Sequence, residues 1–214
     1  MDILLLIALF IVAYLFGSIP TSVWVGKIFY NIDVREHGSG NAGATNTIRV
    51  LGWKAGGPVF IVDGLKGFAA ASLVAFTTFV PATNIYINFQ LALGFAALIG
   101  HIFPIFAGFK GGKGVATLLG VVIALTPISA GLAFGIFLIV LFAFKYVSLG
   151  SMVAGICYSA MILTIFSSKY PTSMKIASIV MAVALLFTHR KNISRLLKGE
   201  ESKASFLYKK KESK

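Results

Sequence analysis

Stretches of apolar residues recur along the whole chain and are separated by shorter polar segments. The apolar stretches cover residues 3–25, 56–80, 87–106, 115–125, 127–144, 152–166 and 174–188. A helix needs about 20 apolar residues to cross the hydrocarbon core of a bilayer, and most of these stretches approach that length. The pattern therefore predicts an all-α polytopic membrane protein with seven transmembrane helical segments.

The stretch over 115–125 is short, and Thr126-Pro127 joins it directly to the next one. If the two are separate segments, only Lys169 and Lys175 of the 19 Lys and Arg residues fall on the outer side. Because Lys and Arg concentrate on the cytoplasmic side, we expect separate segments, an outer N-terminus and a cytoplasmic C-terminus. A proline at the first position of a helix agrees. A re-entrant hairpin over 115–144 would leave the residues that follow it on the same side of the membrane as two separate segments would. Both alternatives therefore stay open.

Composition supports a lipid environment for most of the chain. Of its 214 residues, 57% are hydrophobic and 12% are charged, whereas a soluble domain has about 45–50% apolar and about 25% charged residues. We expect an integral membrane domain over 1–197 and a basic cytoplasmic tail over 198–214. The net charge of +12 follows the membrane topology, so no nucleic-acid partner is expected. The tail either binds anionic lipid headgroups or is simply solvated.

The polar loop after the first apolar stretch is rich in glycine and hydroxyl residues and ends in an arginine. Glycine lets the backbone approach a ligand, successive amides can form an anion-binding nest, and an arginine fork fits phosphate. The loop matches G-x-G-x-x-G, but the dinucleotide fingerprint must follow a strand, so a nucleotide is not expected. A flexible linker is the plain alternative. The predicted site residues here are Gly38, Ser39, Gly40, Asn41, Gly43, Thr45, Asn46 and Arg49.

A second polar loop carries Lys110, Gly111, Gly112 and Lys113 immediately before a predicted helix. The N-terminus of a helix has free amides and partial positive charge, so this loop favours an anion. The alternative is that its lysines only reflect membrane orientation. His101, at the end of the preceding helix, is expected to satisfy a backbone carbonyl.

A third cluster follows the last apolar stretch. His189 and Asn192 are three residues apart and share a helix face, and a histidine can act as a base near neutral pH. A basic juxtamembrane helix is the alternative. Ser151 is expected either to bind substrate or to cap a helix. Asp63 and Lys66 lie one turn apart in an apolar stretch, and we favour a structural ion pair there over a proton relay.

Together these segments resemble the bacterial acyl-phosphate:glycerol-3-phosphate acyltransferase family. The resemblance rests on residues 38–46 with Arg49, on 100–117, and on 189–197, with further support from residues 63–67 and 146–149. It implies a seven-helix enzyme of the bacterial inner membrane with its active site on the cytoplasmic face. Such an enzyme transfers a fatty acyl group from acyl phosphate to the 1-hydroxyl of glycerol 3-phosphate, giving lysophosphatidic acid. No metal-ligand spacing is present, so neither metal nor cofactor is expected, and no obligate protein partner is evident.

The residue types suggest roles in that reaction. The expected catalytic residues are Ser39, Arg49, Lys113, His189 and Asn192. The expected substrate-binding residues are Gly38, Gly40, Asn41, Gly43, Thr45, Asn46, Lys110, Gly111, Gly112 and Ser151. The base is either His189 or the donor's own phosphate, and the acyl chain is expected in a groove between helices. The alternative function is a transporter or channel for an organic phosphate, whose site should lie near the bilayer midplane.

Overall fold

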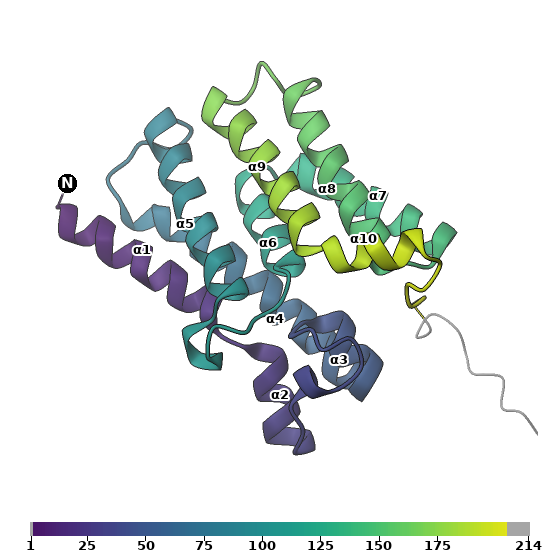
Figure 1. Cartoon of the computed structure of the whole chain (residues 1–214). Coiled ribbons are helices and arrows are strands. Elements are labelled where there is room, and N and C mark those ends of the chain that lie inside the picture. Colours follow the sequence, from purple (N-terminus) through teal and green to yellow (C-terminus); the bar gives the residue numbers. More distant parts are fainter. Residues whose placement is uncertain (1, 205–214) are drawn as a thin grey trace, which may run out of the picture.

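Every regular element of the computed structural model, which describes residues 2–204, is a helix (Figure 1). The α-helices are α1 (Ile3–Ser18), α2 (Thr21–Tyr30), α3 (Ala44–Leu51), α4 (Trp53–Ser72), α5 (Asn84–Ile102), α6 (Val115–Leu125), α7 (Pro127–Phe144), α8 (Val147–Leu163), α9 (Thr172–Thr188) and α10 (Arg190–Leu197). The short 3-10 helices are η1 (Val34–Glu36), η2 (Leu73–Phe76) and η3 (Ile105–Ala107). The expected all-α fold is confirmed for the described residues.

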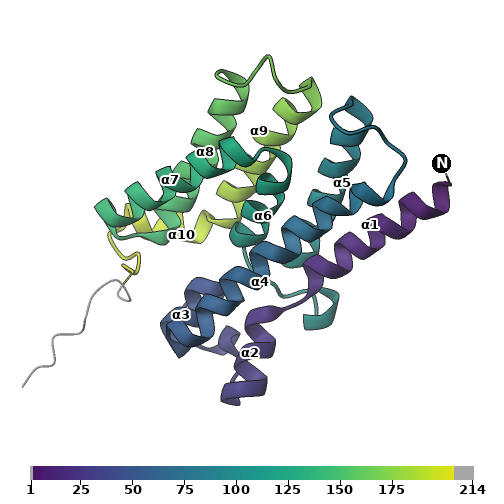
Figure 2. The same cartoon turned by 180° about the vertical axis from the view of Figure 1, so that it is seen from behind.

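The helices pack in two groups that meet where α4 crosses α6 (Figures 1 and 2). In one group α1, α4 and α5 lie together, and in the other α6, α7, α8 and α9 each pack against the next. Small residues make the crossing of α4 and α6 close: a Cβ on Gly67 would lie 2.1 Å from the Thr117 oxygen, and one on Gly120 would lie 1.9 Å from the Gly64 oxygen. Backbone contact of this kind is how helices associate in a membrane.

Three helical stretches are long and apolar enough to cross a membrane, namely Trp53–Phe76, Asn84–Ala107 and Pro127–Phe144. Two bent pairs raise the number to five: α1 with α2, bent by 44°, and α9 with α10, bent by 61°. Helices α6 and α8 are apolar but shorter. The described residues thus form a helical membrane protein, and the number of seven crossings stays a prediction.

Several element boundaries differ from the expected ones, and a proline explains the largest difference. Helices α6 and α7 have the predicted bounds, because Pro127 begins a new helix as expected. The predicted stretch over 3–25 is divided into α1 and α2 by a break at Ile19 and Pro20, although the two helices together are still long and apolar enough for one bent span. A proline has no N–H to donate to the oxygen four positions earlier. The Ile19 oxygen at the break accepts hydrogen bonds from the Thr21 amide at 3.0 Å and from Lys66 Nζ at 2.8 Å.

The expected ion pair between Asp63 and Lys66 is confirmed. Lys66 Nζ lies 2.8 Å from Asp63 Oδ1, both side chains are buried, and Thr21 Oγ1 donates to the same carboxylate oxygen at 3.0 Å. The pair therefore fastens the break between α1 and α2 onto α4. The expectation for His101 is wrong: the partner of its Nδ1 is the hydroxyl of Thr117 at 3.1 Å rather than a carbonyl, because α6 packs against the end of α5.

Candidate active site

The first glycine-rich loop is organised by one buried side chain, that of Asn46. Its Nδ2 donates to the main-chain oxygens of Val34 and His37, at 2.7 and 3.0 Å. Its Oδ1 accepts hydrogen bonds from the amide and the hydroxyl of Ser39, at 2.8 and 3.1 Å. Asn46 was expected to bind substrate, but both ends of its amide hold the loop, so its contribution to binding is indirect.

The glycines of this loop are required by backbone conformation and by close packing. Gly38 and Gly40 have φ angles of 62° and 70°, the left-handed region that glycine enters without steric cost. A Cβ on Gly38 would lie 2.4 Å from Asn46 Oδ1. Gly43 ends the loop as the residue before α3, the helix that carries Thr45 and Arg49.

The expected nest of free amides is wrong for most of the glycine positions. In the first loop the amide of Gly40 donates to His37 and that of Gly43 to Asn41, at 3.1 and 3.0 Å. In the second loop the amides of Gly111 and Gly112 donate to Ile102 and His101, each at 3.2 Å. These amides are used to fold the loops, so an anion must be held chiefly by side chains. This competition between internal carbonyls and ligand is invisible in the sequence.

The two loops are fastened together by Arg35, a residue that the sequence analysis did not select. Its Nε and Nη2 donate to the two oxygens of Asp33, at 2.9 and 2.7 Å. Its Nη1 donates to the main-chain oxygens of Ala107 and Lys110 in the second loop, at 2.9 and 3.3 Å. The hydrogen bond from Arg35 also holds the pKa of Asp33 well below its usual range. A second contact is steric, because a Cβ on Gly112 would lie 2.4 Å from the oxygen of Ala42.

The second loop leads to a polar cluster that joins four parts of the chain. Lys113 Nζ donates to Asn192 Oδ1, and Asn192 Nδ2 donates to Glu201 Oε1 at 2.6 Å. Ser148, in the first turn of α8, donates to the same Glu201 oxygen at 2.7 Å. Arg195 Nε donates to Glu201 Oε2 at 2.7 Å. The carboxylate of Glu201 therefore lies among Ser148, Asn192 and Arg195, of which only Asn192 was a predicted site residue.

The ionisation of this cluster departs from that of free side chains. Burial disfavours the charged form of Glu201, but hydrogen bonds from Ser148, Asn192 and Arg195 outweigh it and lower its pKa. Burial lowers the pKa of Lys113 to about 8. The charge of Glu201 opposes that shift, whereas Arg195 and Arg49 add to it. The site thus brings the charges of α3 and α10 close to Lys113.

His189 lies at the bend between α9 and α10 and is buried. Its Nδ1 lies 2.8 Å from the main-chain oxygen of Leu185. A carbonyl oxygen only accepts, so Nδ1 carries the proton and the neutral ring has a free lone pair on Nε2. His189 is close enough to Lys113 to feel its charge. Asn192 contacts Lys113 directly, and the shared face expected for His189 and Asn192 stays a prediction.

Other predicted site residues lie around this cluster without joining it. Ser39 and Lys110 are exposed, while Asn41 and Thr45 are half-buried. Ser151 is buried one turn inside α8, where its hydroxyl donates to the Val147 oxygen at 2.9 Å. The hydroxyl that reaches the polar cluster is that of Ser148, one turn earlier.

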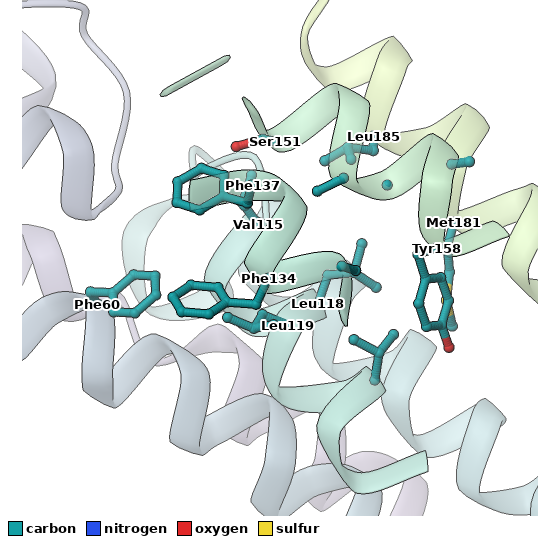
Figure 3. Close-up of a pocket in the computed structure, with 15 residues that line it drawn as sticks. Phe60, Val115, Leu118, Leu119, Phe134, Phe137, Ser151, Tyr158, Met181 and Leu185 are labelled. Carbon is teal, nitrogen blue, oxygen red and sulfur yellow. The ribbon is translucent and has the colours of Figure 1, made fainter. Parts of the chain in front are cut away.

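An apolar cavity begins beside the polar cluster (Figure 3). Val115, two residues after Lys113, and Ser151, three residues after Ser148, line one end of it. Including the open space on its exposed side, the cavity has a volume of about 660 Å³. The other residues that line the cavity are Phe60, Leu118, Leu119, Val122, Ala133, Phe134, Phe137, Ala154, Gly155, Tyr158, Met181, Ala182 and Leu185.

Glu201 is the main functional candidate that the sequence did not reveal. It belongs to a segment that we assigned to a solvated basic tail over 198–214, yet its side chain is only 8% exposed. The amide of Ala204 donates to the oxygen of Lys145 at 2.7 Å, which fastens the same segment to the end of α7. The sequence signal that could have indicated Glu201 is the presence of an acidic residue nine positions after Asn192. Lys209, Lys210, Lys211 and Lys214 lie outside the described residues.

Comparisons with known proteins identify the family of the chain. Residues 7–199 match the family model described as glycerol-3-phosphate acyltransferase. A glycerol-3-phosphate acyltransferase of Listeria monocytogenes is 45% identical over 202 residues, which cover 94% of this chain and 98% of that protein. One from Chlorobium phaeobacteroides is 40% identical over 230 residues, covering 95% and 98%.

Solved structures agree with this assignment. The chain is similar to PlsY, an integral membrane glycerol 3-phosphate acyltransferase, in its glycerol 3-phosphate form. The TM-score is 0.83 at 40% identity, covering 92% of this chain and 94% of that one. The lysophosphatidic acid form of PlsY gives a TM-score of 0.78 at 38% identity, with the same coverage. Together with its apolar helices, these matches make the chain a multi-pass membrane protein, and it belongs to the glycerol-3-phosphate acyltransferase family.

Proposed function

We propose that this protein transfers a fatty acyl group from acyl phosphate to the 1-hydroxyl of glycerol 3-phosphate, giving lysophosphatidic acid and inorganic phosphate. One observation carries the proposal most directly: the cationic cluster around Lys113 adjoins the apolar cavity at Val115 and Ser151. Such a site fits a molecule with a phosphate head and a hydrocarbon tail, which describes both the donor and the product. The glycerol 3-phosphate and lysophosphatidic acid forms of PlsY support the acceptor and the product of the proposed reaction.

Arg49 and Lys113 neutralise phosphate in this proposal. Both phosphates are anionic, and bringing them together requires cations placed in advance. The Coulombic influence of Arg49 on Lys113 supports a shared role. Ser39 is exposed in the first loop, and its hydroxyl exchanges its hydrogen bond to Asn46 Oδ1 for one to the donor phosphate, with Gly38 and Gly40 permitting the approach. The side chains of Thr45 and Lys110 extend the same anion-binding surface.

His189 and Asn192 hold the acceptor. The unprotonated Nε2 of His189 can accept a hydrogen bond from the 2-hydroxyl of glycerol 3-phosphate, which leaves the 1-hydroxyl free to attack the acyl carbon and to donate its own proton to the phosphate. The 1-hydroxyl oxygen forms a bond to the acyl carbonyl carbon, and the bond from that carbon to the phosphate oxygen breaks. The hydroxyl proton goes to the departing phosphate, so the donor itself serves as base. Positioning and charge neutralisation then supply most of the catalysis.

The acyl chain of the donor occupies the apolar cavity between α6, α7, α8 and α9. The lining is almost wholly hydrocarbon and aromatic (Figure 3), and transfer of methylenes into such surroundings from water is favourable by about 0.8 kcal/mol each. Phe60, Phe134 and Phe137 stand at the end that opens beside the polar cluster. The donor can therefore enter from the bilayer without its chain crossing water.

The membrane topology completes the proposal. Seven segments, an outer N-terminus and an active site on the cytoplasmic face of a bacterial inner membrane are supported by the distribution of positive charge. Lys169 and Lys175 lie at the opposite end of the helices from the loops that carry Lys110 and Lys113. Arg190 and Lys191, exposed at the start of α10, are placed to contact anionic lipid headgroups on that face.

The test is a reconstitution assay with palmitoyl phosphate and labelled glycerol 3-phosphate. The unaltered protein should form labelled lysophosphatidic acid, and Lys113→Ala and His189→Ala should lower turnover at least about a hundredfold, the scale of a lost charge-stabilising group. Lys175→Ala is the matched control, since this lysine lies away from the site, and it should retain full activity. Near-normal turnover in Lys113→Ala would refute the phosphate-binding role. Uptake of labelled glycerol 3-phosphate into vesicles without product would favour a transporter.

A further inference from the structure

The apolar cavity has two unlike ends. One end adjoins the polar cluster and is lined by Val115, Phe137 and Ser151. The other end is lined by Tyr158 and Met181, which lie across the cavity from Ser151 and Phe137 in Figure 3. Ser151 and Tyr158 are two turns of α8 apart, which is about 10 Å at a rise of about 1.5 Å per residue. The cavity therefore runs along the helices, away from the phosphate-binding groups and toward the bilayer interior.

The far end is closed by a tyrosine held in one orientation. Tyr158 is 4% exposed, and its hydroxyl lies 2.9 Å from Thr126 Oγ1. The Thr126 hydroxyl donates its own proton to the Val122 oxygen at 3.1 Å. The hydrogen bond between the two hydroxyls must therefore run from Tyr158 to Thr126. Since Thr126 is fixed at the junction of α6 and α7, the ring cannot swing aside without losing a buried hydrogen bond.

Packing behind the ring leaves no continuation of the cavity among the described residues that surround it. Tyr158 belongs to the core that α6 to α9 form, together with the fully buried Ile162 and Met174. Interiors packed at this density respond to the addition or loss of a single methylene. A hydrocarbon chain that enters beside Ser151 must therefore stop or turn when it reaches the ring.

We propose that Tyr158, braced by Thr126, is the floor of the acyl-chain site and sets the chain-length preference of the enzyme. The inference rests on the proposed function, because it assigns the cavity to the acyl chain of the donor. Tyr158 acts as a specificity-determining residue through its volume. Its hydroxyl serves to position the ring and takes no part in acyl transfer.

Two substitutions on α8 with opposite effects on the depth of the cavity test whether Tyr158 limits the length of the acyl chain. Tyr158→Ala deepens the site, whereas Ala154→Phe fills it one turn nearer the polar cluster. The measurement is kcat/KM for acyl phosphates of 12, 14, 16 and 18 carbons with glycerol 3-phosphate, for the protein in bilayer vesicles. Ile156→Ala is the matched control, because Ile156 is 49% exposed on the outer face of the same helix.

Tyr158→Ala should shift the preference to longer chains and Ala154→Phe to shorter ones. Each methylene that gains or loses a buried place changes kcat/KM by a factor of about four. The ratio for 18 against 14 carbons should therefore change by about tenfold or more, in opposite directions. Tyr158→Phe keeps the ring and should keep the preferred length, and Ile156→Ala should leave the ratio unchanged.

The outcomes distinguish a failure of the role proposed for Tyr158 from a failure of the proposed function on which that role rests. If the unaltered protein forms lysophosphatidic acid and the ratio is the same in Tyr158→Ala and Ala154→Phe, the floor assignment is refuted while the proposed function stands. If Tyr158→Ala does not fold, the shift in Ala154→Phe decides alone. If the unaltered protein makes no product from any chain length, the function and the floor are both refuted.

Discussion

The guanidinium of Arg35 reaches from the first polar loop to the main-chain oxygen of Ala107 in the second, with a distance of 2.9 Å from Nη1. The same side chain is paired with Asp33 on its other edge. Arg35 thus fixes the separation of two loops that are far apart in the chain and that both supply groups to the site.

Arg35→Gln should raise the KM for glycerol 3-phosphate about tenfold with a smaller effect on kcat. A hydrogen bond to a charged group contributes about 1.5–3 kcal/mol, and its loss lets the second loop move away from the first. Steady-state kinetics in vesicles measures both constants. Lys27→Gln is the matched control, because the 57% exposed Lys27 pairs with the same Asp33 at 3.4 Å. Equal effects of the two substitutions would contradict a specific role for Arg35.

Gly112→Ala should disrupt the contact between the two loops. The added Cβ would lie 2.4 Å from the Ala42 oxygen and 2.5 Å from His101 Nε2, so the second loop must shift and carry Lys113 with it. We expect a loss of glycerol 3-phosphate affinity of at least about tenfold, since such displacements of a binding group are costly. Gly131→Ala, on α7 where a Cβ meets nothing within 4 Å, should leave affinity unchanged. Unaltered affinity in Gly112→Ala would show that the loops need not touch.

The affinity for glycerol 3-phosphate should fall as the pH rises through about 8. Burial lowers the pKa of Lys113 to about 8, so the ammonium is charged below this pH and neutral above it. The phosphate of the substrate has its second pKa near about 6 and stays dianionic through this range. Profiles of kcat/KM against pH measure the effect. Lys113→Arg should remove the alkaline decline, because a guanidinium stays charged; a decline that persists would assign it to another group.

Breaking the buried pair of Asp63 and Lys66 should be more harmful than removing both charges. Asp63→Asn leaves the Lys66 ammonium buried beside the Ile19 oxygen, and an unpaired buried charge costs about 3–5 kcal/mol. In the double variant Asp63→Asn with Lys66→Met, most of that loss should be recovered. Thermal unfolding in detergent gives the comparison. A double variant no more stable than the single one would mean that the charges also serve another purpose.

The sequence predicted those features of the fold that depend on local signals. Pro127 follows an apolar stretch at the point where the distribution of Lys and Arg requires two separate segments. The bounds of the helices on both sides were therefore predicted correctly. Pro20 carries the same local signal, but it lies inside an unbroken apolar stretch with no charge on either side, and the break there was missed. Helix α3 was taken for loop because its eight residues have only a short apolar face.

The parts of the site that were missed depend on long-range contacts. Arg35 is one of several cations in its loop, and only the folded chain brings it to Ala107 and Lys110. Glu201 follows the last helix among basic residues, where a solvated tail is the ordinary expectation. The predicted amide nests failed for a related reason, since the sequence shows that Gly111 and Gly112 have amides but not that nearby carbonyls already accept from them.

The position of Glu201 has a consequence for how the protein is made. The carboxylate joins Ser148, Asn192 and Arg195 from a position that follows α10 in the chain. The polar cluster is therefore complete only after Glu201 has left the ribosome. A chain that terminates early, just after α10, inserts every helix described here but leaves Lys113 and Arg195 without the anion between them. Such a product would occupy the membrane as an assembled helical body with an unfinished active site.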